Sequence, residues 1–118
     1  MGNILIVDDE KEMCQVLSDY FQSEGYEVDI AFDAYDALNK IRQHKYQYLL
    51  VDLVLPGSMN GIDVIKNTKK YSPNTYIVAY SGFCDEDISE KVIRAGANKF
   101  ITKPFKQQEL FNLMFNRH

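Results

Sequence analysis

Five short apolar runs along the chain predict the strands of a β-sheet. Three of them, residues 4–7, 48–51 and 76–79, are continuous and rich in β-branched or aromatic residues, which is typical of strands covered on both faces in a parallel sheet. The other two, residues 28–32 and 99–102, are weaker and mix polar with apolar positions, as edge strands with one exposed side do. The pattern therefore predicts three central strands and two edge strands.

Between these runs, apolar residues recur with the spacing of amphipathic helices. Gly25 and Gly96 stand where the first and fourth of these helices would end, and Asp33 is placed to cap the start of the second. The third of these helices is predicted to end before residues 72–74. The apolar positions of the five predicted helices are Met13, Val16, Leu17, Tyr20 and Phe21; Ala34, Ala37, Leu38 and Ile41; Ile62 and Ile65; Ile88, Val92 and Ala95; and Leu110, Leu113 and Met114.

The strict alternation of strands and helices predicts an α/β fold. Such alternation gives a parallel sheet with right-handed crossovers and helices on both faces. Of the common doubly wound orders, 2-1-3-4-5 puts the three most apolar strands in the centre. We therefore expect residues 1–118 to form a single domain, with a five-stranded parallel sheet of this flavodoxin-like order and five helices on two faces. Ligands of such sheets bind beyond the carboxyl ends of the strands, between strands 1 and 3.

Composition restricts the classes of function. The 118 residues are 46% hydrophobic and 25% charged, which is ordinary for a globular domain. A net charge of −4 disfavours binding to nucleic acid phosphates as the main role. The sequence shows neither an apolar run of roughly 18 residues for a membrane span nor a secretory signal. Cys14 and Cys84 form no C-x-x-C pair, so we expect packed, reduced thiols in a cytoplasmic protein that binds neither nucleic acid nor a membrane.

Acidic residues follow two predicted strands that are neighbours in the sheet. Asp8, Asp9 and Glu10 come directly after the first strand, and Asp52 ends the third. A single Asp after a strand is often only a helix cap, but carboxylates that converge repel one another and so take up a cation or protons. Oxygen ligands in an incomplete shell favour Mg²⁺, which keeps several waters and accepts phosphate oxygens. The acids therefore predict a Mg²⁺ site.

Two further polar side chains are expected at the same edge of the sheet. Ser81 ends the fourth strand, and Lys103 follows the fifth. A carboxylate cluster with a hydroxyl and an ammonium describes a phosphoryl-transfer site, where the cations neutralise phosphoryl oxygens while a carboxylate attacks as the nucleophile.

As a spaced set, these residues make the chain resemble the receiver domains of bacterial two-component response regulators over its whole length. The resemblance implies that Asp52 accepts a phosphoryl group from a phosphohistidine of a sensor histidine kinase or phosphotransfer protein. It thus implies a signalling phosphoacceptor, not an enzyme with an external substrate, and Mg²⁺ as cofactor. The motifs that carry it are IVDDE at residues 6–10, VDL at 51–53, LP at 55–56, YSG at 80–82, GA at 96–97 and KPF at 103–105.

The resemblance also implies the contacts of the ion and of the phosphoryl group. Ser81 would bond the phosphoryl oxygens and Lys103 would pair with them, and the Lys103–Pro104 peptide bond would be cis. The implied metal ligands are Asp8, Asp9, Asp52 and the backbone carbonyl of Val54.

A conformational switch is implied as well. Phe100 falls at the position of the family's switch aromatic, which is more commonly Tyr, so its switch would rest on packing alone. Movement of Ser81 toward the phosphoryl group would leave space for Phe100 and remodel the face of the fourth helix, fifth strand and fifth helix. That face would serve a phosphorylation-dependent homodimer or a downstream output domain.

Three features lead to more specific expectations. Gly61 lies nine positions after Asp52, one more than the family pattern, and we expect the extra residue in 56–61 to loop out without disturbing Val54. Val54 and Phe83 are bulky and apolar where water would approach, which predicts a long-lived aspartyl phosphate.

On the first helix, Leu17 and Phe21 should be core residues. The neighbouring positions expected to form an exposed docking patch for the phosphodonor are Met13, Val16 and Tyr20.

Four other functions fit the sequence less well. A flavodoxin-like ligand binder needs a Ser/Thr/Gly phosphate loop after the first strand, where this chain has acids that repel the anion. A phosphatase of the haloacid dehalogenase type needs a second Asp where Val54 stands, and a nucleotide hydrolase needs the missing G-x-x-x-x-G-K-[ST] loop. A degenerate receiver that serves only as a scaffold is the remaining alternative, and the complete acid set argues against it.

Overall fold

The computed structural model describes residues 2–83 and 85–115, in which strands and helices alternate strictly. The strands match the predicted runs to within two residues at each end. In chain order the elements are β1 (Asn3–Val7), α1 (Lys11–Ser23), β2 (Glu27–Ala31), α2 (Ala34–Gln43), β3 (Tyr48–Asp52), α3 (Gly61–Tyr71), β4 (Tyr76–Ser81), α4 (Glu86–Ala95), β5 (Lys99–Thr102) and α5 (Gln107–Phe115).

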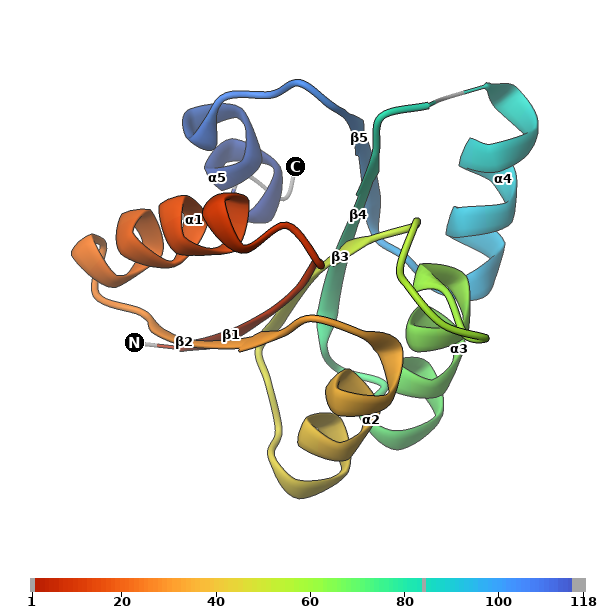
Figure 1. The fold of residues 1–118 in the computed structure, drawn as a ribbon, viewed down its shortest axis with the longest axis horizontal. Coiled ribbons are helices and arrows are strands. Elements are labelled where there is room, and N and C mark those ends of the chain that lie inside the picture. The colour runs from red at the N-terminus through yellow and green to blue at the C-terminus, as the bar shows by residue number, and fades with distance from the viewer. Residues whose placement is uncertain (1, 84, 116–118) are drawn as a thin grey trace.

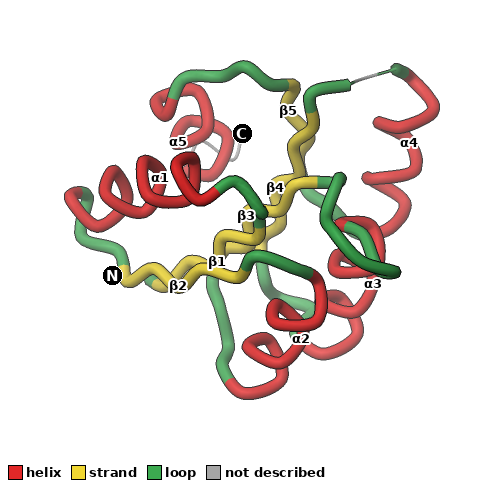
Figure 2. The backbone as a smooth tube through the Cα atoms, in the orientation of Figure 1, coloured by secondary structure: helices red, strands yellow, loops and turns green. Residues whose placement is uncertain are grey.

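The strands form one parallel sheet in the order β2-β1-β3-β4-β5, so the predicted fold class is confirmed. Helices α1 and α5 cover one face of this sheet, and α2, α3 and α4 cover the other (Figures 1 and 2). As predicted, β1, β3 and β4 are central, and the less apolar β2 and β5 lie at the edges.

Strand alternation divides the core into two layers. In β1, for example, Leu5 and Val7 pack with the residues under α2 and α3, whereas Ile4 and Ile6 pack with those under α1 and α5. All four side chains are fully buried. Burial of each such side chain stabilises the fold by about 1.5–3 kcal/mol. The strands are therefore held from both faces of the sheet, and this fixes the position of the polar residues at their ends.

The helix ends follow the predicted signals. Gly25 has φ +95° just after α1, and Gly96 has φ +125° at the end of α4, a left-handed conformation that favours glycine. The carboxylate of Asp33 accepts a hydrogen bond from the Asp36 backbone N–H at the start of α2. These residues therefore set where α1 and α4 end and where α2 begins.

Cys14 is buried and free, as expected of a packed thiol, and burial together with nearby acids raises its pKa to about 11. Cys84 lies outside the described residues. Within residues 2–83 and 85–115, every helix is too short or too polar to cross a membrane.

Tyr46 provides a test of the packing at the amino-terminal edge of the sheet. Tyr46 is buried, and its hydroxyl donates to Asp29 Oδ2 at 2.6 Å in a partly buried hydrogen bond. Burial together with this carboxylate raises the pKa of Tyr46 well above its ordinary value near 10. We expect Tyr46→Phe to lower the free energy of unfolding by about 1–2 kcal/mol at neutral pH.

The same bond predicts a pH dependence with a definite sign. Because the unfolded chain releases the Tyr46 proton near pH 10 and the folded chain only at higher pH, this stabilisation is complete below about pH 10 and declines as the pH rises further. Urea unfolding at neutral pH and above about pH 10 measures both effects. A wild-type protein and a Tyr46→Phe variant that lose stability in parallel at high pH would contradict this assignment.

Candidate functional site

The alternation of the strands brings four polar side chains to one face of the sheet at its carboxyl-terminal edge. Every second residue of a strand points to the same side. The residues that pack toward α1 and α5 near this edge are Ile6 of β1, Leu50 of β3, Val78 of β4 and Ile101 of β5. The residues two positions further along are, in the same order, Asp8, Asp52, Tyr80 and Lys103.

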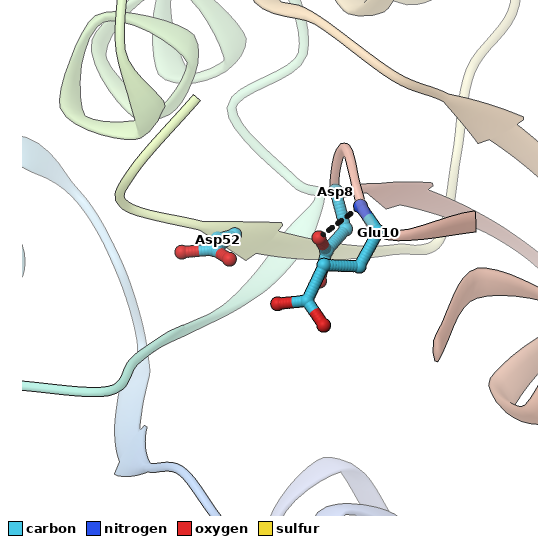
Figure 3. Close-up of side chains that lie close together, drawn as sticks. All are labelled: Asp8, Glu10 and Asp52. Atoms are coloured by element: carbon cyan, nitrogen blue, oxygen red, sulfur yellow. Dashed lines mark hydrogen bonds between the residues drawn. The ribbon is translucent and has the colours of Figure 1, made fainter. Parts of the chain in front are cut away.

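Three carboxylates converge at this edge (Figure 3). One oxygen each from Asp8, Glu10 and Asp52 lies within 4.8 Å of the other two. Asp8 and Asp52 are buried, whereas Glu10 is exposed. Such a cluster is unfavourable without a cation, and a set of oxygen ligands suits a hard divalent ion such as Mg²⁺.

Lys103 supplies a positive charge to the cluster. Its Nζ lies 2.8 Å from Asp52 Oδ2, 3.1 Å from Glu10 Oε1 and 3.7 Å from Asp8 Oδ2. Burial alone would lower the pKa of Lys103, but the hydrogen bonds to Asp52 and Glu10 and the charge of Asp8 raise it well above its ordinary value. The side chain is therefore an ammonium. The Lys103–Pro104 bond that follows is cis, as the resemblance implied.

Asp8 is the most buried of the acids. Its desolvation raises its pKa, while hydrogen bonds from the Glu10 backbone N–H (2.9 Å) and the Tyr80 hydroxyl (2.8 Å), with the charge of Lys103, act in the opposite direction. Tyr80 did not figure among the residues expected at the site. The signal that identifies it is its place in β4, on the same face as Asp8.

Asp52 and Ser81 end the neighbouring strands β3 and β4. Asp52 Oδ1 accepts a hydrogen bond from the Val54 N–H at 3.0 Å, which fixes the carboxylate against its own loop. Ser81 is buried, and its Oγ accepts from the Phe83 N–H at 3.2 Å. Because Ser81 comes one position after Tyr80, it faces the other side of the sheet, the side on which Phe100 packs.

Asp9 lies differently from its neighbour. Its side chain is exposed and borders an open depression of about 410 Å³, which Asp52, Val54 and Lys103 also line. All four acids were expected to converge, and within the described residues the close carboxylate cluster contains Asp8, Glu10 and Asp52 without Asp9. The longer side chain of Glu10 reaches Lys103. Asp8, Glu10 and Asp52 therefore converge as predicted, while Asp9 lies at the rim of the depression.

The loop after β3 contains an exposed segment, residues 56–58. Gly57 has φ +95° there, and the hydroxyls of Ser58 and Tyr35 are 2.8 Å apart. Asn60 then caps α3 through a reciprocal pair of hydrogen bonds with Asp63. The looping-out of one extra residue in this exposed segment stays a prediction.

Comparisons with known proteins identify the family. The sequence model of one protein family, the response regulator receiver domain, matches residues 4–115. Chemotaxis protein CheY of Thermotoga maritima is 38% identical over 104 residues, covering 87% of this chain and 86% of that protein. The uncharacterized transcriptional regulatory protein YkoG of Bacillus subtilis is 33% identical, covering 92% of this chain and 47% of its own length. The chain thus spans about half of that regulator.

Solved structures of receiver domains have the same fold as this chain. A CheY-like response regulator receiver domain protein from Methanospirillum hungatei superposes with a TM-score of 0.90 at 30% identity, covering 95% of this chain and 89% of that one. The BeF3-activated DrrB receiver domain gives 0.88 at 26% identity, covering 99% of both chains. The match of the family model over nearly the whole sequence, on a fold and an acidic cluster of this kind, shows that the chain belongs to the response regulator receiver domains, the phosphoacceptor domains of two-component signalling.

Proposed function

We propose that residues 1–118 form one receiver domain in which Asp52 accepts a phosphoryl group from a phosphohistidine of a sensor histidine kinase or phosphotransfer protein. The observation that carries the proposal is the position of Asp52. Its carboxylate ends a central strand, lies 2.8 Å from the Lys103 ammonium and belongs to a cluster with Asp8 and Glu10. In the transfer, an Asp52 oxygen attacks phosphorus, and the electron pair of the breaking P–N bond returns to the donor imidazole.

The residues around Asp52 suit Mg²⁺ as the cofactor. When bound, the ion would neutralise oxygens of the phosphoryl group. Lys103 would pair with the same group, and the Ser81 hydroxyl would donate to it, as charge develops on those oxygens. Glu10 is a further oxygen donor at this edge. The ligands that we propose are Asp8, Asp9, Asp52 and the backbone carbonyl of Val54.

Labelling with acetyl phosphate tests this assignment without a partner protein. Intact-mass spectrometry should find one added phosphoryl group on the wild type when Mg²⁺ is present and none when it is chelated. Asp52→Asn should remain unlabelled, whereas Asp19→Asn, an exposed control on α1, should label as the wild type does. Labelling of Asp52→Asn at the wild-type rate would refute the proposal, and a scaffold without acceptor activity would show no labelling at all.

Helix α1 carries partly exposed apolar side chains beside this site. Leu17 and Phe21 are buried as predicted, Val16 is 48% exposed, and Met13 and Tyr20 are half-buried. A depression of about 270 Å³, lined among others by Glu10 and Phe105, joins the patch to the acidic edge. We propose that an apolar surface of the phosphodonor packs against Met13, Val16 and Tyr20 while its histidine reaches Asp52.

Substituting the most exposed of these residues separates docking from chemistry. We expect Val16→Asp to slow phosphotransfer from the cognate donor at least about tenfold, a loss of about 1.4 kcal/mol of binding, and to leave acetyl phosphate labelling unchanged. Ile93→Asp, an equally exposed control on α4, should leave both reactions unchanged. Normal transfer to Val16→Asp, or NMR shifts by the donor that avoid α1, would contradict the docking patch.

Ser81 and Phe100 are placed to couple phosphorylation of Asp52 to the surface formed by α4, β5 and α5. Phe100 pairs in register with Ala79 and packs half-buried against the core on the Ser81 side of the sheet. Phosphorylation adds about two negative charges at Asp52. Ser81 would move to bond the new oxygens, and Phe100 would fill the space it leaves. We propose that this remodels α4, β5 and α5 for a homodimer or an output domain, which beryllofluoride-induced NMR shifts in these elements, lost in Ser81→Ala, would test.

The rim of the site predicts slow loss of the phosphoryl group. Val54 and Phe83 are 71% and 63% exposed, so their bulky apolar side chains lie outside the core, and Val54 lines the depression beside Asp52. We expect Val54→Asn combined with Phe83→Glu to speed hydrolysis roughly tenfold, or about 1.4 kcal/mol of barrier, because polar side chains orient the attacking water. The decay of labelled protein measured by mass spectrometry checks this, and an unchanged half-life would rule it out.

A further inference from the structure

We propose that Tyr80 is a positioning residue of the Mg²⁺ site, whose hydroxyl holds the Asp8 carboxylate in the orientation that binds the ion. The inference rests on the proposed function, since the ion concerned is the one that would assist phosphorylation of Asp52. Tyr80 itself touches neither the ion nor the phosphoryl group in this proposal and acts through Asp8.

Tyr80 connects two strands that do not pair with each other. It is fully buried in β4, in register with Asp52 of β3, and its hydroxyl donates to Asp8 Oδ2 at the end of β1 at 2.8 Å. Strand β3 lies between β1 and β4. The tyrosine ring therefore spans the strand of the phosphoacceptor and links its two neighbours at the edge where the carboxylates gather.

The hydrogen bond from Tyr80 holds the Asp8 carboxylate in one orientation, together with a second donor. The backbone N–H of Glu10 donates to Oδ1 at 2.9 Å, and Tyr80 donates to Oδ2 at 2.8 Å. With one donor on each oxygen, the carboxylate cannot rotate without breaking a bond, while each oxygen keeps a lone pair for a cation. Lys103 Nζ, at 3.7 Å from Oδ2, is too far away to take the place of the hydroxyl. Partners of this kind orient metal ligands and tune their affinity.

The surroundings of the ring hold the hydroxyl in place. The Lys103 Nζ lies 5.2 Å from the centroid of the Tyr80 ring, and Phe105 packs against the ring edge-to-face at 5.4 Å. A cation at this distance is attracted to the ring face. A tyrosine hydroxyl is protonated at neutral pH, so it has a proton to donate to Asp8.

A second tyrosine allows a structural role to be separated from a positioning role. Tyr46 is also buried and also donates to a carboxylate, Asp29, but it lies before β3 at the opposite edge of the sheet. Removing either hydroxyl costs one buried hydrogen bond and lowers the melting temperature. Only removal of the Tyr80 hydroxyl frees a carboxylate of the acidic cluster.

The experiment is a Mg²⁺ titration of the wild type, Tyr80→Phe and Tyr46→Phe, followed by calorimetry and by the amide NMR signals of residues 8–10. We expect Tyr80→Phe to raise the Mg²⁺ dissociation constant about tenfold, as loss of such partners typically does, and Tyr46→Phe to leave it unchanged. The acetyl phosphate labelling rate of Tyr80→Phe should need more Mg²⁺ for half-saturation and reach the wild-type rate at saturation. Melting curves verify that both variants are folded, and Tyr80→Met repeats the test with a flexible apolar side chain.

The outcomes distinguish this inference from the function on which it rests. Wild-type Mg²⁺ affinity in both Tyr80 variants, or equal weakening in Tyr80→Phe and Tyr46→Phe, would overturn the positioning role and leave the phosphoacceptor assignment intact. A wild-type protein that binds no Mg²⁺ would overturn the proposed function and the positioning role together.

Discussion

Lys103→Met is expected to destabilise the Mg²⁺-free protein by about 2–3 kcal/mol and to tighten its binding of Mg²⁺ about tenfold. The substitution keeps an unbranched side chain but leaves Asp8, Glu10 and Asp52 close together without their cation. Breaking a buried ion pair in this way costs about 3–5 kcal/mol, and the partial exposure of Lys103 reduces this figure. In the wild type, the lysine neutralises carboxylates that Mg²⁺ would otherwise bind, so its removal favours the ion.

Urea unfolding of the variant with and without Mg²⁺ measures both effects. Mg²⁺ should stabilise Lys103→Met more than it stabilises the wild type, because the ion then supplies the counter-charge that Lys103 no longer provides. Lys106→Met, an exposed control three residues further along, should stay within about 0.5 kcal/mol of the wild type. If Lys103→Met were as stable as the control without Mg²⁺, or bound the ion more weakly than the wild type, the charge balance described for this cluster would be wrong.

Gly61→Ala is expected to cost about 3 kcal/mol of stability and to slow labelling of Asp52. A Cβ at position 61 would lie 2.2 Å from the carbonyl oxygen of Asp52 and 2.6 Å from the Cα of Leu53. Both are backbone atoms, so the strand end that carries the acceptor would have to shift, and such overpacking costs about 1–3 kcal/mol or more. The effect reaches the site because the start of α3 packs directly against the end of β3.

Gly82→Ala is the matched control, since a Cβ there meets no atom within 4 Å. It should leave the free energy of unfolding within about 0.5 kcal/mol of the wild type. Chemical denaturation gives the stabilities, and acetyl phosphate labelling at saturating Mg²⁺ gives the rates. Equal stability of the two alanine variants would mean that the close approach between Gly61 and Asp52 is not a constraint in solution.

The elements and the placing of Asp8, Asp52 and Lys103 were predictable because they follow from local patterns. Continuous apolar runs mark buried parallel strands, and residues just beyond such strands meet at one edge whatever the details of packing. The sequence placed all four acids at this edge, but it did not predict that Glu10 joins the close cluster and Asp9 does not. That difference depends on how the loop turns after Asp8 and on the reach of the Glu10 side chain toward a lysine 93 positions away.

Tyr80 and Gly61 show a second limit of sequence reasoning. Within its apolar run Tyr80 looks like any core residue, and the partner of its hydroxyl lies just after β1, a strand with which β4 does not pair. The spacing of Gly61 from Asp52 is visible in the sequence, but the reason for a glycine, contact with the acceptor's own backbone, is a tertiary one. Both depend on distances between elements that local patterns do not contain.

Locating the phosphoryl group in the wild-type protein tests most directly whether Asp52 is the acceptor. After labelling with acetyl phosphate, reduction by borohydride converts an aspartyl phosphate to homoserine, and peptide sequencing by mass spectrometry shows its position. We predict homoserine at position 52 in samples labelled with Mg²⁺ and at no position in samples without it. Homoserine at another aspartate, such as position 8 or 9, or labelling that leaves position 52 unmodified, would contradict the role assigned to this site.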